Sequence, residues 1–359
     1  GRPPRIREIW RLPDHARTLR EIAETGAASF YTGRLAERID ACSRRQGGFL
    51  RLSDLAKYDV EWVEPIGIDY RGYRVWEIPP NGHGLNALMA LNIMKWLEMD
   101  AVPAAPSPSA PLAPAAATVH RQIEAMKLAF TDGKHYITDP RWMRVRPEEL
   151  LSEAYARERS RLITEKALAP YPGNPKGGGT VYLAAADRDG SMVSFIQSNY
   201  HGFGSGVVVP GTGIALHNRG CEFSLDPADA NALHPGKKTY HTIIPGFLTK
   251  DGRAVGPFGV MGGYMQPQGH MQVVMNILDF GMNPQAALDA PRWMWAGDRS
   301  VRLEPHFPKE IAEDLARRGH RVEYAAEIGF GRGQMIWRTE DGVLLGATDP
   351  RADGLVAAW

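Results

Sequence analysis

A threonine that follows three glycines is the residue of this chain with the clearest chemical potential. Thr180 comes directly after Gly177, Gly178 and Gly179, where a Lys- and Pro-containing coil meets a strand-like run. A threonine hydroxyl is a weak nucleophile, but a freed α-amine, with a pKa of about 7.7–8.0, can act as its base. Cleavage of the Gly179–Thr180 bond would create this pair, and glycines permit the strained backbone that cleavage requires. Taken alone, these four residues favour a simpler interpretation, a flexible linker that enters a strand.

Histidines and cysteines give no sign of a metal or cofactor site. Four histidines are scattered without the spacing of a metal-binding motif, and the two cysteines lie too far apart in sequence to indicate a disulfide framework. We therefore predict neither a metal site nor a cofactor. The residues in question are His83, His201, His217, His241, Cys42 and Cys221.

The overall composition is that of a soluble globular protein, with 43% hydrophobic residues. The 42 lysines and arginines nearly balance the 41 aspartates and glutamates, so no strong field favours nucleic acid. Apolar runs are interrupted well short of a membrane span, which argues against a membrane partner. The first residues lack the apolar core of a signal peptide, but a chain that begins with Gly leaves its compartment open.

The elements before Thr180 are expected to be mostly helical. Apolar residues recur at helical spacing in two stretches between residues 12 and 47, and again in 85–99, 119–130 and 147–166. Alternation predicts a strand over 71–78, and the Pro-Pro-Asn-Gly-His-Gly sequence at 79–84 predicts a turn from it into the next helix. The Pro- and Ala-rich segment 101–117 is expected to be a surface loop.

The elements after Thr180 are expected to be mostly strands. Residues 180–186 and 192–198 are strand-like runs joined by Asp187-Arg188-Asp189-Gly190-Ser191, which predicts a hairpin. Further strands are expected at 213–217, 242–249 and 255–260, with helices over 269–280, from 283 and over 308–318, and a last hairpin of 334–338 and 343–347. This order indicates an α+β fold, with helices on both sides of stacked, largely antiparallel strands.

From about Leu12 to Trp359 the chain resembles the γ-glutamyltranspeptidase family, which belongs to the N-terminal-nucleophile (Ntn) hydrolases. Several separate stretches carry the resemblance in the family's order and spacing. They are Ile78-Pro79-Pro80 with its Gly-rich loop, Glu124-Ala125-Met126-Lys127-Leu128-Ala129-Phe130, Thr180 with Asp187-Arg188-Asp189-Gly190, Gly202-Phe203-Gly204-Ser205-Gly206, Met261-Gly262-Gly263, Asp289-Ala290-Pro291-Arg292 and Asp349-Pro350-Arg351.

The resemblance implies roles for four catalytic residues. Thr180 falls at the nucleophile that becomes a new N-terminus, and Ser198 falls at a second hydroxyl that hydrogen-bonds it. Gly262 and Gly263 fall where two successive backbone N–H groups form an oxyanion hole.

The acyl-donor site departs from the family pattern. Glu222 matches an acidic residue that pairs with the α-amino group of a γ-glutamyl donor. Tyr200 and Arg219 replace amide side chains that bind the same α-amino group in the family. His241-Thr242 replaces two serines that hold the α-carboxylate. Arg219 is interpreted either as a surface partner of Glu222 or as a ligand for a donor carboxylate, which would suit glutaryl amides.

The family's architecture implies an αββα sandwich that is incomplete without a segment upstream of this chain, where the family carries a further arginine that clamps the donor. In that scheme residues 1–179 are the C-terminal part of a large subunit, residues 180–359 are the small catalytic subunit, and the two associate after cleavage.

The function implied is a γ-glutamyltransferase or γ-glutamyl hydrolase that passes an acyl group from a small-molecule amide, through Thr180, to water or an amine. One alternative keeps the same site for a glutaryl or cephalosporin-type acylase or a natural-product hydrolase. A second alternative is an inactive binding or scaffold protein, because Val181 and Tyr182 replace the threonine and histidine usual after the nucleophile.

Overall fold

The computed structural model describes residues 2–99, 114–170, 179–325 and 329–359. The chain forms two compact units, one of Gly1–Trp62 with His201–Asn218, the other of Val63–Tyr200 with Arg219–Trp359. The predicted loop over 101–117 lies largely outside the described residues. Across the described part of the chain, no helix is both long and apolar enough to span a membrane.

The smaller unit is a helical cluster closed by a returning loop. Its core is formed by Ile39, Cys42 and Val209, so the loop packs on the helices. The two helices expected between residues 12 and 47 are confirmed, but the strand expected at 213–217 is wrong. That segment forms only an isolated bridge between Val208 and Ala215, because turns interrupt the ladder. The helices are α1 (Pro13–Glu24), α2 (Ala28–Tyr31), α3 (Arg34–Arg45) and α4 (Leu52–Ala56).

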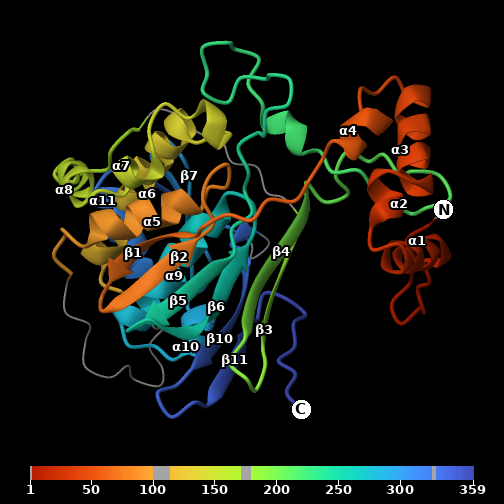
Figure 1. The fold of residues 1–359 in the computed structure, drawn as a ribbon. Coiled ribbons are helices and arrows are strands. Elements are labelled where there is room, and N and C mark those ends of the chain that lie inside the picture. Colours follow the sequence, from red (N-terminus) through yellow and green to blue (C-terminus); the bar gives the residue numbers. More distant parts are fainter. Residues whose placement is uncertain (1, 100–113, 171–178, 326–328) are drawn as a thin grey trace. The chain divides into compact units, whose positions relative to one another are not determined.

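A six-stranded antiparallel sheet is the centre of the larger unit (Figure 1). Its order is β1-β2-β5-β6-β10-β11, so strands from both sides of Thr180 share one sheet. The strands are β1 (Ile66–Tyr70), β2 (Tyr73–Glu77), β5 (Gly246–Lys250), β6 (Arg253–Met261), β10 (Arg332–Arg338) and β11 (Leu344–Thr348).

Helices cover one face of this sheet. Every residue of α5 (Gly84–Met94) is buried, which explains why its sequence is apolar all round. It packs against β1, β2, α6 (Ala116–Tyr136) and α9 (Met265–Leu278), and α9 also packs against β6. α5 ends at Met94 and not near residue 99 as expected.

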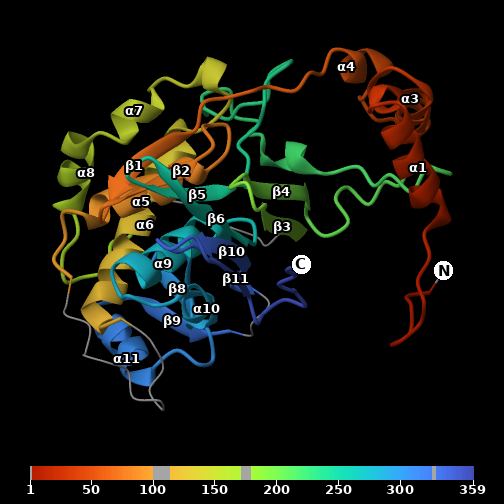
Figure 2. The ribbon, with the colours of Figure 1, turned by 60° about the horizontal axis from the view of Figure 1, so that its bottom comes forward.

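A three-stranded sheet and short helices complete this unit (Figure 2). β7 pairs with β8 antiparallel, and β8 pairs with β9 parallel. These elements are β7 (Trp293–Gly297), β8 (Ser300–Leu303), β9 (Arg321–Tyr324), α7 (Pro147–Leu150), α8 (Glu153–Ser160), α10 (Pro284–Asp289), α11 (Lys309–Arg317) and the 3₁₀ turns η1 (Pro140–Trp142) and η2 (Arg219–Glu222).

The predicted hairpin forms a second layer against the six-stranded sheet. β3 (Gly179–Ala186) pairs with β4 (Met192–Tyr200), and β3 packs on β6 and β10. Its outer face is apolar and exposed, through Val181, Leu183, Val193 and Phe195. The α+β expectation of stacked, largely antiparallel sheets is therefore confirmed.

Candidate active site

The hydroxyl of Thr180 meets that of Ser198 across the hairpin. The register pairs these two residues, and their Oγ atoms lie 3.0 Å apart. Thr180 is 8% exposed, and Ser198 Oγ also accepts the backbone N–H of Tyr200 at 2.9 Å. The pairing is irregular between Gly179 and Thr180, at the bond where cleavage is predicted. The structure thus brings together the two hydroxyls that the family resemblance singled out.

Gly262 and Gly263 form the turn between β6 and α9. Gly262 has φ +146° and Gly263 has φ +58°, values that residues other than glycine rarely adopt. Their carbonyls accept hydrogen bonds from Met265 and Gln266 in the first turn of α9. The turn therefore stands at the N-terminal end of a 14-residue helix, where backbone N–H groups favour negative charge.

The hairpin that carries Thr180 packs on the strand that leads to this turn. Ser194, farther along the hairpin, donates to the carbonyl of Gly246, which pairs with Phe258 in β6. Tyr182 covers Gly259, where an added Cβ would lie 2.5 Å from the tyrosine ring. The hairpin that carries Thr180 therefore packs on β6, the strand that Gly262 and Gly263 follow.

Glu222 joins the nucleophile side of the site to the glycine turn. Its Oε1 accepts the phenol of Tyr200, two residues after Ser198, and its Oε2 accepts the phenol of Tyr264 at 2.6 Å, directly after Gly263. The ammonium of Lys134, in the last turn of α6, lies 3.7 Å from Oε2 and also donates to the Tyr264 hydroxyl. One carboxylate therefore gathers groups from α6, β4, η2 and the start of α9.

Arg219 is a buried cation at the same site. It is 5% exposed, so the surface ion pair considered from the sequence does not describe it. Its Nη1 donates to Thr242 Oγ1 at 2.7 Å, and its guanidinium lies 3.9 Å from the centre of the Tyr200 ring. The neighbouring His241 accepts the backbone N–H of His83 at 2.9 Å through its carbonyl. Arg219, Tyr200, His241 and Thr242 thus belong to one continuous set of contacts.

Four further residues, Lys134, His83, Tyr240 and Tyr264, belong to the site and were given no role in it from the sequence. Lys134 lies 4.6 Å from the centre of the Tyr240 ring, and the Tyr240 hydroxyl contacts His83 Nδ1 at 3.2 Å. Burial, followed by the charges of Lys134 and Arg219, lowers the pKa of His83 well below its usual value, so this imidazole is neutral near pH 7. Their only sequence signal is proximity to quoted motifs, since Lys134 follows the 124–130 motif and Tyr264 follows the glycine pair.

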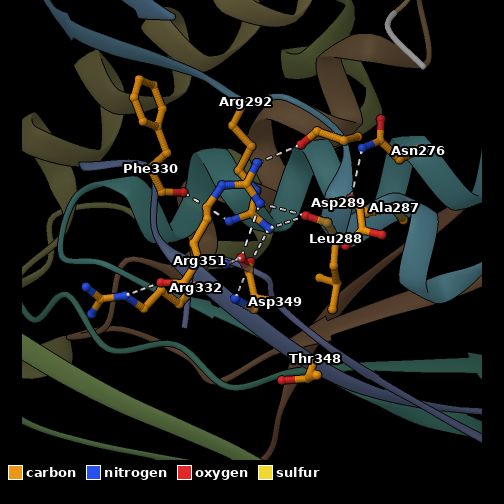
Figure 3. A network of polar contacts seen from close by, with 12 residues as sticks. Asn276, Ala287, Leu288, Asp289, Arg292, Phe330, Arg332, Thr348, Asp349 and Arg351 are labelled. Carbon is orange, nitrogen blue, oxygen red and sulfur yellow. Dashed lines mark hydrogen bonds and ion pairs between the residues drawn. The ribbon is translucent and has the colours of Figure 1, made fainter. Parts of the chain in front are cut away.

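A second polar network, beside the glycine turn, joins two of the quoted motifs (Figure 3). Arg292 and Asp349 form a buried ion pair at 2.7 Å, and Arg351 binds the other oxygen of Asp349 at 3.2 Å. Arg292 also donates to the carbonyl of Phe330 at 3.0 Å. The next residue, Gly331, lies directly against Gly262. A Cβ added to Gly262 would stand 3.0 Å from the Cα of Gly331. These motifs therefore support the turn and do not form a site of their own.

Substitution of Arg292 with methionine should destabilise the protein by about 3 kcal/mol, because it leaves the Asp349 carboxylate buried without its main partner. The measurement is urea unfolding of the variant and the parent protein. Arg302→Met is the matched control. Arg302 is half exposed, and its nitrogen lies 3.9 Å from the carboxylate of the exposed Glu323, so its ion pair is weak. If Arg292→Met lowered the free energy of unfolding no more than the control does, Arg292 would not support the glycine turn as assigned.

One buried cluster has the composition of a metal site. His120, Glu124 and His320 converge, with His120 Nδ1 and His320 Nε2 2.8 Å apart. The Glu124 carboxylate, however, is already held by the ammonium of Lys127 at 2.7 Å and by the backbone N–H of Leu168 at 2.9 Å. Since Lys127 supplies the compensating positive charge, we assign this cluster a structural role.

The chain is similar to known proteins along its whole length. The family model described as gamma-glutamyltranspeptidase matches residues 1–359. The glutathione hydrolase-like YwrD proenzyme of Bacillus subtilis (strain 168) is 36% identical over 361 residues, which cover 99% of this chain and 67% of the relative. An oxamate amidohydrolase proenzyme of Klebsiella pneumoniae is 36% identical over 367 residues, which cover 100% of this chain and 67% of that relative.

A solved structure shares the fold closely. The crystal structure of cephalosporin acylase from Bacillus halodurans superposes with a TM-score of 0.92 at 61% identity, covering 100% of this chain and 65% of that chain. The chain thus spans about two thirds of the length of the proteins it matches. Two of these proteins are named as hydrolases and the third as an acylase, and the substrates in their names differ.

Proposed function

Since the chain belongs to the gamma-glutamyltranspeptidase family, we propose that it is an Ntn amidohydrolase whose nucleophile is Thr180, freed by self-cleavage at Gly179–Thr180. The observation that carries the proposal is the contact between the Thr180 and Ser198 hydroxyls, at the irregular start of β3. The relatives' names support maturation by cleavage, since both curated relatives are called proenzymes.

The catalytic cycle follows from the residue chemistry. The Thr180 hydroxyl attacks the amide carbonyl while its own α-amine accepts the proton, and Ser198 orients the attacking oxygen. The backbone N–H groups of Gly262 and Gly263 are assigned to the oxyanion. The amine of the donor leaves with a proton, and water or an acceptor amine then releases the acyl group from Thr180.

The proposed cleavage would leave the two pieces bound to each other. β2 precedes Thr180 and pairs with β5, which follows it, through Val75 and Leu248. α6 precedes Thr180 as well and carries Lys134 to Glu222. We therefore assign residues 1–179 and 180–359 to a large and a small piece that stay associated through a shared sheet and a shared site.

The proposed donor is an amide of a short acyl group that carries its own charge. Glu222 supports γ-glutamyl amides, because a carboxylate can pair with an α-ammonium group. Arg219 supports glutaryl amides, because a buried guanidinium favours a carboxylate. The relatives named for glutathione and for cephalosporin represent both possibilities, and the same site could serve a natural-product amide.

The function is tested on the full-length protein by denaturing gel electrophoresis and N-terminal sequencing. We expect two pieces, one of them beginning Thr180-Val181-Tyr182, together with release of nitroaniline from an acyl nitroanilide. Both should appear because the same hydroxyl performs cleavage and turnover. A single persistent chain without turnover would favour a binding or scaffold protein, and a small piece that begins elsewhere would exclude Thr180.

A further inference from the structure

The carboxylate expected to receive a donor's ammonium group already has an ammonium group beside it. Lys134 Nζ lies 3.7 Å from Glu222 Oε2, and Tyr264 donates to that same oxygen at 2.6 Å. The other oxygen accepts Tyr200. Because both carboxylate oxygens have partners within the protein, an incoming ammonium would have to share or displace one of them.

Lys134 is held in this position and is not a flexible surface side chain. Its ammonium lies 4.0 Å from the centre of the Tyr264 ring and 4.6 Å from that of Tyr240, within cation–π range. It also donates to the Tyr264 hydroxyl. The Lys134 side chain is 32% exposed and that of Glu222 12%, so water screens this charge only in part.

The charges of the site do not balance. Lys134 and Arg219 are cations and Glu222 is the carboxylate that they face, while burial keeps His83 neutral. The other acid that acts on Lys134, Asp229, is exposed. Among the described residues around Glu222, this leaves one positive charge in a partly buried site. A monoanionic acyl group would neutralise it, whereas a zwitterionic γ-glutamyl group would add no net charge and would place a second ammonium beside Lys134.

We propose that Lys134 is a built-in counter-ion of Glu222 that sets donor specificity, so that the acyl group carries a carboxylate and no α-ammonium, as in a glutaryl amide. The inference rests on the proposed function and reverses the preference for γ-glutamyl donors that Glu222 alone would indicate. Lys134 is a positioning residue in this assignment, because it acts through Glu222 and not on the reacting atoms.

The experiment compares three nitroanilides on the cleaved full-length enzyme, namely glutaryl, γ-glutamyl and the uncharged pentanoyl. We expect kcat/KM to be at least about tenfold higher for glutaryl than for γ-glutamyl, because like charges beside each other oppose binding of the latter. Lys134→Met should reduce that ratio by about tenfold or more, chiefly through KM, with pentanoyl turnover measured as the uncharged reference. Lys309→Met, at a lysine whose side chain is 81% exposed, is the matched control and should keep the ratio.

A binding measurement separates this inference from the proposed function. Titration calorimetry with the product acids should show tighter binding of glutarate than of L-glutamate, with the order weakened or reversed in Lys134→Met. A γ-glutamyl or L-glutamate preference in the parent protein, or an unchanged ratio in Lys134→Met, would overturn the role of Lys134. Failure of all three anilides with the glutarate preference intact would instead contradict the proposed catalysis and leave the specificity assignment supported.

Discussion

Substitution of Thr180 with alanine is expected to leave one uncut chain and no detectable turnover. The hydroxyl is the group proposed to attack both the Gly179 carbonyl and the donor amide, and it contacts the Ser198 hydroxyl. Gel electrophoresis after prolonged incubation, followed by an anilide assay, measures both effects. The loss of turnover should exceed about a thousandfold, as for removal of other catalytic nucleophiles.

Thr180→Ser is the matched control, because it keeps the hydroxyl and removes only a methyl group. It should retain cleavage and part of the turnover. Circular dichroism should show all three proteins folded, since Thr180 contributes one contact at the start of a strand that is paired along its length. Normal cleavage in Thr180→Ala would show that another residue cuts the chain.

Substitution of Gly262 with alanine is expected to lower kcat by about 100- to 1000-fold, the usual effect of removing an oxyanion-hole donor. The new Cβ would stand 3.0 Å from the Cα of Gly331, and φ of +146° is strained for alanine. Relaxation must move the turn, and with it the N–H groups assigned to the oxyanion. Steady-state kinetics with a good anilide donor measures the change.

Gly281→Ala is the control for backbone strain alone. Gly281 also has positive φ, +65°, at the end of α9, but an added Cβ there meets no atom within 4 Å. This variant should lose roughly 1 kcal/mol of stability and keep its kcat. Equal kcat losses in both variants, or none in Gly262→Ala, would remove the glycine turn from the mechanism.

The local features of the site could be predicted from the sequence. The hairpin of 180–186 and 192–198 follows from two strand-like runs around an Asp- and Gly-rich turn, and strict alternation places Thr180 and Ser198 opposite each other. The glycine pair before α9 was singled out through the family resemblance, and both of its residues have positive φ. The assigned roles of these residues remain predictions.

Secondary-structure errors occurred where short segments offer little periodicity. β1, β7, β8 and β9 have only four or five residues and were not predicted. The strand expected over 242–249 begins only at Gly246, since the preceding residues form the loop that contacts Arg219 through Thr242. Neighbouring strands or side chains, which a local pattern does not contain, decided these segments.

By itself the sequence determined the hairpin of 180–186 and 192–198 and the family, and it predicted Thr180 as the nucleophile. The tertiary structure alone decided how the donor site is charged. The sequence left open whether Arg219 pairs with Glu222 or binds a donor carboxylate, but Lys134 reaches Glu222 because α6 packs on α5, which itself packs on β1, β2 and α9. Spacing along a helix predicts which face is buried and not which distant charge lies at its end. That information resides in long-range packing, which places groups from four elements around one carboxylate.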